Sequence, residues 1–230
     1  SNAFKNCSSF TGQLKIPNSV VSIESGAFNQ CCRLSGSLVI PNSIKTIKSD
    51  VFNGCFGFNE TLTIPNSVTT IESCAFCNCS GFVGSLIIPN TVTYIGTNAF
   101  FNCYSFSGQL TISNSIERIE SGTFYNCTNL SGFLMIPNSV TFIGNNTFYG
   151  CSSFTGQLII LNTITFIGMN AFCFCSGFTG ELIIPNSINC IESGTFRNCS
   201  GLTGTPKIPS SVTSICSYAF ESCILFMPIF

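Results

Sequence analysis

The sequence predicts a solenoid built from short, stacked coils, and two observations carry that prediction. The phrase Ile64-Pro65-Asn66-Ser67-Val68, or a close variant, returns every 24 residues without insertion or deletion. Its first residue falls at Ile16, Ile40, Ile64, Ile88, Ile112, Ile136, Ile160, Ile184 and Ile208. Self-similarity with a fixed period of about 20–50 residues is typical of repeat architectures. We therefore expect residues 4–230 to form a single solenoid of about nine 24-residue repeats, and residues 1–3 to be a remnant of tag cleavage.

Each repeat begins with a short strand, as the unit that starts at Phe82 illustrates. Residues 85–89 alternate around Leu86 and end in a proline, which indicates a short β-strand. Residues 90–91 form a turn, and residues 92–95 suit a second extended segment. The Phe and Cys of residues 96–103 are three positions apart and share one face of a single helical turn. The sequence therefore predicts short strands with one short helical turn per repeat.

The repeated apolar positions explain why such units must stack. Phe recurs at 4, 28, 52, 76, 100, 124, 148, 172, 196 and 220, and Cys recurs at 7, 31, 55, 79, 103, 127, 151, 175, 199 and 223. Burying one such side chain contributes roughly 1.5–3 kcal/mol, whereas ordering a residue costs on the order of 1.5 kcal/mol. A lone unit of 24 residues therefore cannot fold. Stacking at about 4.8 Å turns each position into a continuous column of like side chains.

Composition excludes several classes of partner. Charged residues make up 7% of the 230-residue chain and the net charge is −1, whereas ordinary soluble domains contain about 25% charged residues. No basic field is present to attract nucleic acid or an anionic membrane surface. No apolar run approaches the roughly 20 residues of a membrane-spanning helix. We therefore expect no nucleic-acid partner, no membrane span in this chain and no cofactor.

The repeat pattern Leu-x-Ile-Pro-Asn-Ser-Val-x-x-Ile-x-x-x-Ala-Phe-x-x-Cys resembles the BspA-type leucine-rich repeat over essentially the whole chain. The resemblance implies a leucine-rich-repeat solenoid, a right-handed curved superhelix with its Leu-x-Ile strands on the concave side. Departures at Glu60, Ser113 and Leu161 affect local turns. Members of this family are typically surface or secreted proteins of anaerobic bacteria and parasitic protists, and some are adhesins for host matrix proteins or neighbouring cells.

Sixteen cysteines raise the question of disulfides and metals. We expect the ten cysteines of the repeat column to be buried free thiols, because unpaired Cys packs as a small hydrophobe, although stacked neighbours are close enough to bridge. Cys74, Cys77 and Cys79 resemble half of a zinc site, but no second pair and no His accompany them. Cys190 and Cys216 lie in adjacent units and form a weak disulfide candidate. No metal site is predicted.

Catalysis has little support, because a chain without His lacks the Ser/His and Cys/His arrangements of nucleophilic enzymes. Glu24, Lys48 and Glu72 share one column and predict an alternating surface ladder of little energetic value. Asn-x-Ser/Thr sequences either carry glycans or simply mark turns, and they occur at Asn6, Asn59, Asn78, Asn126, Asn129, Asn145 and Asn198. We expect no enzymatic activity.

The variable columns are where function can differ from scaffold. Outward strand positions are apolar in the middle of the chain and polar towards its ends, which is typical of a protein-binding strip; β-propensity alone is the competing explanation. The candidate binding residues are Phe133, Met135, Ile159, Ile183, Ile87, Tyr94, Phe142 and Phe166. The leading hypothesis is a non-enzymatic protein-binding module of a cell-surface or secreted adhesin-like protein. Its partner would be a host extracellular matrix or cell-surface protein, bound through the concave sheet.

A second hypothesis is a structural or intracellular scaffold. The segment Ile224–Met227 would expose an apolar last coil, since solenoids need polar caps for solubility. Under this hypothesis the chain forms homo-oligomers through its ends or edges.

Overall fold

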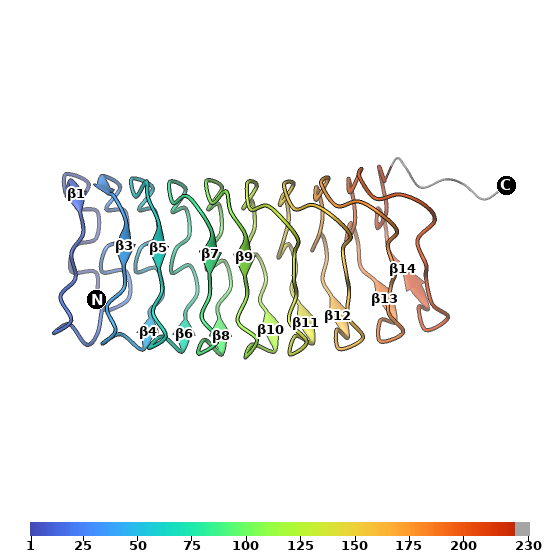
Figure 1. Ribbon diagram of the computed structural model, residues 1–230, viewed down its shortest axis with the longest axis horizontal. Helices are drawn as coiled ribbons and strands as arrows, with labels where there is room; N and C mark the ends of the chain where they lie inside the picture. Colours follow the sequence, from blue (N-terminus) through green and yellow to red (C-terminus); the bar gives the residue numbers. More distant parts are fainter. Residues whose placement is uncertain (224–230) are drawn as a thin grey trace.

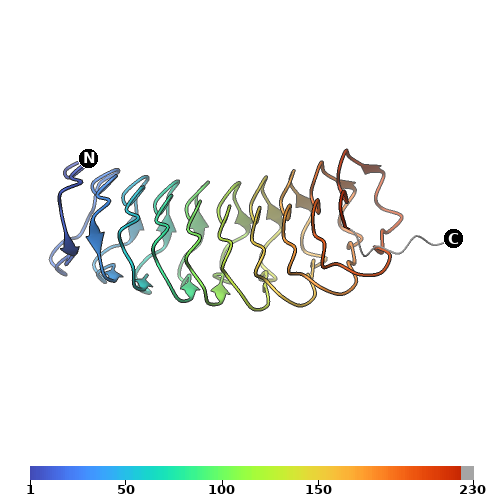
Figure 2. The same cartoon turned by 90° about the horizontal axis from the view of Figure 1, so that it is seen from above.

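The protein is a single row of stacked coils that runs from the N-terminal coil at one end to the coil of β14 (Ser214–Ile215) at the other (Figure 1). The computed structural model describes residues 1–223, so the predicted apolar segment Ile224–Met227 lies outside the described residues. Seen from above, the row bends only slightly (Figure 2). The predicted stacking of 24-residue units is confirmed, whereas the right-handed sense of the superhelix stays a prediction.

Two-residue strands hold neighbouring coils together. Those of residues 1–223 are β1 (Gly12–Gln13), β2 (Leu34–Ser35), β3 (Leu38–Val39), β4 (Thr46–Ile47), β5 (Leu62–Thr63), β6 (Thr70–Ile71), β7 (Leu86–Ile87), β8 (Tyr94–Ile95), β9 (Leu110–Thr111), β10 (Arg118–Ile119), β11 (Phe142–Ile143), β12 (Phe166–Ile167), β13 (Cys190–Ile191) and β14 (Ser214–Ile215). Every pairing among them is parallel. Nearly all join residues 24 positions apart, for example Ile47 with Ile71. One turn of the chain therefore equals one sequence repeat.

All of these strands except β1 and β2, which pair with each other, belong to two separate ladders. The Leu-x-Ile strands make the first, with β3 paired to β5 and β7 paired to β9. The second runs along the lower edge of the coils in Figure 1 and contains β4-β6-β8, β10-β11-β12 and β13-β14. In the C-terminal half the first ladder continues as the bridge of Ile183 with Lys207, whereas the other bridges, such as Gly156 with Phe178, have the same offset of 22 residues as Gly12 with Leu34 in β1 and β2. The predicted strands at residues 85–89 and 92–95 thus exist, each shortened to two residues.

The core is a file of stacked phenylalanine rings, as predicted. Rings of the Phe column from Phe4 to Phe220 lie parallel to their neighbours, with centroids 5.2–5.8 Å apart. A second file includes Phe58, Phe82 and Phe106, with centroids 5.1 and 5.8 Å apart. The first file meets the second edge-on, for example Phe52 against Phe58. Because this spacing exceeds that of paired strands, the rings overlap with an offset, as aromatic pairs prefer.

The predicted helical turn in each repeat is wrong, because the described residues contain turns and no helix. Between residues 96 and 103 the amides alternate between two partners. Ala99 N–H donates to Gly96 O within the coil, whereas Phe100 N–H donates to Thr123 O of the next coil. Asn98 and Asn102 have φ values of 57° and 58°, so a left-handed residue interrupts the segment every four positions. A helix would need all these amides for its own carbonyls; here half of them join the coils.

The column cysteines are buried free thiols, as expected, with Cys7 of the first coil the half-exposed exception. Each Sγ from Cys31 to Cys223 donates a hydrogen bond to the carbonyl of a phenylalanine 27 residues earlier. The Cys127 Sγ, for example, lies 3.2 Å from the Phe100 carbonyl oxygen. These thiols therefore fill space and also donate a second hydrogen bond to carbonyls that already accept one within their own coil, as Phe100 O does from the Cys103 amide.

Asparagine side chains also join neighbouring coils. The side chains of Asn78, Asn102 and Asn126 form a ladder with steps of 3.0 and 3.2 Å. These residues have positive φ, which Asn tolerates better than most residues. In several of the turns after the Leu-x-Ile strands a hydroxyl bridges coils, as when Thr91 Oγ1 donates to Val68 O at 2.8 Å, and in one turn the Asn114 backbone amide donates to Asn90 Oδ1 at 3.1 Å. The neighbouring asparagines are exposed.

Candidate binding surface

The first candidate surface is the strand face, which we define as the outward positions of the Leu-x-Ile strands and of the coils that continue them. Because successive side chains of a strand point to opposite sides, Leu134 and Ile136 are buried while Met135 between them is 69% exposed. Ile159 is 58% exposed and Phe133 is 65% exposed. Along the row the strand face consists of Lys15, Val39, Thr63, Ile87, Thr111, Met135, Ile159, Ile183 and Lys207, with Phe133 beside it.

The strand face is hollowed at several places. Near its N-terminal end a groove of about 460 Å³ lies between Lys15 and Val39, and two more grooves lie further along the row. A groove of about 560 Å³ lies between Thr111 and Met135 and is walled by the side chains of Asn90, Asn114 and Gln109. A smaller groove of about 270 Å³ lies between Ile159 and Ile183. The groove beside Met135 combines an apolar floor with amide groups, and the groove beside Ile159 is mainly aliphatic. Such grooves can accept side chains of a partner and offer hydrogen bonds at their rim.

Phe133 is held on the strand face by a glycine. A Cβ placed on Gly156 would come within 2.2 Å of the Phe133 ring, so the ring lies directly against the backbone of the next coil. Gly156 also has a φ of 76°, a conformation that side chains rarely adopt. The Phe133 ring is therefore positioned before any partner arrives, which reduces the entropy lost on binding.

The remaining predicted binding residues belong to a second surface, the aromatic stripe, formed by Tyr94, Arg118, Phe142 and Phe166. They lie on β8, β10, β11 and β12, in the other ladder of strands. The rings of Phe142 and Phe166 stack with centroids 4.9 Å apart. The Arg118 guanidinium lies 3.6 Å from the centre of the Phe142 ring, a cation–π contact. The structure therefore divides the eight predicted residues between two surfaces.

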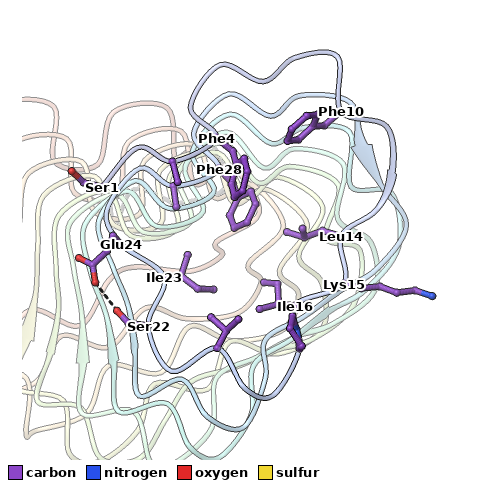
Figure 3. Close-up of a pocket in the computed structure, with 14 residues that line it drawn as sticks. Ser1, Phe4, Phe10, Leu14, Lys15, Ile16, Ser22, Ile23, Glu24 and Phe28 are labelled. Atoms are coloured by element: carbon purple, nitrogen blue, oxygen red, sulfur yellow. Dashed lines mark hydrogen bonds between the residues drawn. The ribbon is translucent and has the colours of Figure 1, made fainter.

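An apolar cavity at the N-terminal end of the row has a different character. It encloses about 480 Å³ at the N-terminal coil, and Figure 3 shows Phe4, Phe10, Leu14, Ile16, Ile23 and Phe28 around it. These residues occupy the columns that form the buried core in later coils. The cavity is thus the core seen in cross-section, where the first coil has a neighbour on one side only. It indicates no specific ligand.

Charges on the surface pair locally. Lys48 Nζ lies 2.6 Å from a Glu24 carboxylate oxygen, which confirms the predicted contact between these neighbours of one column. Glu72 instead accepts hydrogen bonds from the Ser49 amide and hydroxyl. The Lys48 ammonium lowers the pKa of Glu24 through their hydrogen bond. Both partners are exposed to water, so the pair contributes little stability.

The buried thiols are poor nucleophiles. Burial raises the pKa of Cys127 to about 12 and that of Cys55 to about 12, and it raises the pKa of Cys79 well above its ordinary value. A cysteine nucleophile needs the opposite, a lowered pKa and a neighbouring base. The thiols of this column are therefore suited to packing in the core and not to nucleophilic attack in a covalent mechanism.

Of the two cysteine groups that the sequence suggested, one lies where the structure brings three ligand atoms together. Within residues 1–223, Cys74, Cys77 and Cys79 do not bring three ligand atoms together. Cys190 and Cys216 do approach each other, with their sulfurs 3.8 Å apart, although both thiols are free. Glu192 joins them, and the three ligand atoms lie within 4.8 Å of one another. Sequence reasoning found the pair but missed the carboxylate.

The amide walls of the groove at Met135 were also missed. Asn90 and Asn114 belong to a column whose regular recurrence indicated only a turn. The signal that could have found them is positional, because this turn directly follows the exposed strand. Side chains at a strand end stand beside the outward residues of the neighbouring coils.

Within residues 1–223 there is no helix with the length and apolar character needed to cross a membrane. The family model for the BspA type leucine rich repeat region matches residues 1–131, 57–179 and 105–227. No curated protein matches the chain.

Three solved structures resemble the coil row. A leucine rich cell surface protein from Faecalibacterium prausnitzii A2-165 is 30% identical, with a TM-score of 0.63 over 98% of this chain and 67% of that one. A leucine-rich repeat protein from Bacteroides ovatus is 28% identical, with a TM-score of 0.63 over 99% and 68%. The leucine rich repeat protein of T. pallidum, 20% identical with a TM-score of 0.59 over 83% and 78%, shares the fold. The family model covers most of the sequence, and this chain therefore belongs to the BspA-type leucine-rich repeat family.

Proposed function

We propose that this chain is a non-enzymatic protein-binding module of a cell-surface or secreted protein, and that it binds through the strand face. The observation that carries the proposal is the run of exposed apolar side chains at Met135, Ile159 and Ile183 in three consecutive coils. A folded protein rarely leaves such a contiguous strip in water without a use for it. Adhesion to a host matrix or neighbouring-cell protein is the activity we expect of it.

The chemistry of the strand face favours a protein over a small polar ligand. Met and aromatic side chains are enriched in the buried centres of interfaces. Here Met135 lines a groove of about 560 Å³, and the exposed Phe133 is two residues away in the sequence. Charged groups lie further along, where Lys207 pairs with Glu181 at 2.7 Å. An apolar centre with a polar surround is the usual composition of a protein-binding patch. A surface location is supported by the similarity to the cell surface protein of F. prausnitzii.

The double substitution M135E/I159E tests the proposal. Two carboxylates in the centre of the strand face should weaken binding by at least about 30-fold, the loss expected when an interface anchor worth 2 kcal/mol is removed. The measurement is surface plasmon resonance with the immobilised chain against a panel of purified extracellular matrix proteins. The melting temperature should stay unchanged, because both side chains already face water.

The matched control is F56E/Y104E, which places two carboxylates at exposed apolar positions away from the strand face. It should bind like the parent chain. Equal binding by M135E/I159E and the parent would contradict the strand face as the site, and loss of binding in Y94E alone would assign the partner to the aromatic stripe instead. Self-association through ends or edges stays a prediction of the alternative scaffold hypothesis, and light scattering at high concentration tests it.

A further inference from the structure

The strands β13 and β14 bring three metal-ligating side chains to one point on the outside of the solenoid. Ile191 pairs with Ile215, and the Cys216 amide donates to the Ile191 carbonyl at 2.9 Å. Ile191 is buried, so Cys190 and Glu192 on either side of it face outward together. Cys216 occupies the column of Glu192 one coil later. Two thiols and one carboxylate therefore converge, with all three ligand atoms within 4.8 Å.

The same two columns hold ion pairs in other coils. Glu120 occupies the position of Glu192 three coils earlier, and Arg118, at the position of Cys190, binds it at 2.9 Å. Glu24 occupies that position seven coils earlier, and Lys48, at the position of Cys216, binds it at 2.6 Å. At Glu192 both cationic positions hold cysteine. Within residues 1–223 no Lys or Arg forms a salt bridge with Glu192.

Glu192 thus keeps the carboxylate of this column, while Cys190 and Cys216 place thiols, which are soft metal ligands, where Arg118 and Lys48 place positive charges in their coils. Three acidic groups at one point repel one another once ionised. A divalent cation would relieve this repulsion and would supply the positive charge that Arg118 and Lys48 supply in their coils.

The distances suit a particular class of ion. Thiolates about 2.3 Å from a tetrahedral Zn²⁺ stand about 3.8 Å apart, and the sulfurs of Cys190 and Cys216 are 3.8 Å apart. A disulfide would require the sulfurs to approach to about 2.05 Å. Thiolate ligands select Zn²⁺ over Mg²⁺ or Ca²⁺, which prefer oxygen.

We propose that Cys190, Glu192 and Cys216 form a binding site for one Zn²⁺ or a similar thiophilic divalent cation. Each thiol releases its proton to solvent, and each thiolate sulfur and one carboxylate oxygen donate a lone pair to the ion. One ion therefore displaces two protons, and nothing is oxidised or reduced. Three protein ligands leave the fourth tetrahedral position open to water.

The experiment uses the full chain kept reduced by a phosphine, so that no disulfide competes. Zn²⁺ is titrated in competition with a chromophoric chelator, and Cd²⁺ is titrated while the cadmium–thiolate absorption band is recorded. We expect one ion per chain and a thiolate band of two sulfurs. C190S and C216S should each weaken Zn²⁺ binding by at least about 10-fold, the smallest loss seen when even an outer-shell partner of a zinc ligand is removed. Calorimetry in two buffers should show two protons released per ion.

Two further variants separate a metal site from a structural role. C190R recreates the Arg118–Glu120 pair at Glu192, so it should abolish stoichiometric Zn²⁺ binding and leave the melting temperature of the metal-free chain unchanged. C74S/C77S removes a thiol pair elsewhere and should bind Zn²⁺ like the parent. The proposal is overturned if C190S, C216S and C190R all retain the parent affinity, or if C74S/C77S removes the binding. It is also overturned if the reduced parent binds no ion, which would leave Cys190 and Cys216 a hydrogen-bonded thiol pair only.

Discussion

Replacing Phe124 with Ala should destabilise the protein by about 3–5 kcal/mol, the usual cost of emptying a buried phenylalanine site. Phe124 is fully buried. Its ring stacks between those of Phe100 and Phe148, with centroids 5.8 and 5.5 Å away. The substitution removes both contacts and leaves a cavity at an interior coil. Neighbouring coils cannot close that cavity, because their spacing is fixed by hydrogen bonds on every side.

The effect should extend beyond one coil. In a solenoid each coil contacts only its neighbours. A weaker contact between two coils therefore allows the parts of the row on either side of it to unfold separately. Urea unfolding followed by circular dichroism should therefore show a lower midpoint and a shallower transition than in the parent chain. The matched control is F56A, since Phe56 is 53% exposed and surface truncations usually change stability by less than about 0.5 kcal/mol. A loss in F124A no larger than that of F56A would mean that the phenylalanine file is not the core.

The buried columns could be predicted from the sequence because each coil has to bury the same apolar positions against its neighbours. The columns of Phe100 and Cys103 are buried from Phe28 to Phe196 and from Cys31 to Cys223 for the same reason, so their period identifies both the fold and the buried side. The turn that joins them could not be predicted in this way. A Phe and a Cys three positions apart fit a helical turn as well as they fit two consecutive tight turns. Only the left-handed backbone conformations of Asn98 and Asn102 distinguish the two.

The candidate binding residues divide for a related reason. Sequence identifies which positions vary, and those positions include both Met135 and Tyr94. The predicted turn at residues 90–91 separates the strand that carries Ile87 from the strand that carries Tyr94, but the sequence does not show that their outward side chains belong to different ladders. Similarly, the convergence of Glu192 with Cys190 and Cys216 depends on the parallel register of β13 and β14. Aligning the repeats with one another predicts which residues of β13 and β14 pair. It does not predict which side chains point outward, because that depends on which residue of each strand is buried.

The second large effect should come from alkaline pH. Burial raises the pKa of Cys127 from an ordinary value of 9.0 to about 12, and it shifts the pKa of Cys103, Cys151 and Cys175 upward in the same direction. Above pH 9 an unfolded chain loses these thiol protons while the folded chain keeps them. The folded state then binds more protons, so stability falls as pH rises.

Each fully buried thiol should lose about 1.4 kcal/mol of stability per pH unit between its unfolded and folded pKa values. Several such thiols act together, so the reduced protein should unfold cooperatively between pH 9 and 12, the two pKa values of Cys127. The measurement is the urea midpoint at pH 8, 9, 10 and 11 in the presence of a phosphine reductant. C127A gives the matched comparison: it should be less stable at pH 8 because of its cavity, and its stability should fall less steeply with pH, by about one proton's contribution. Parallel pH profiles for C127A and the parent would contradict the assignment, because they would mean that Cys127 ionises as readily in the folded coil as in the unfolded chain.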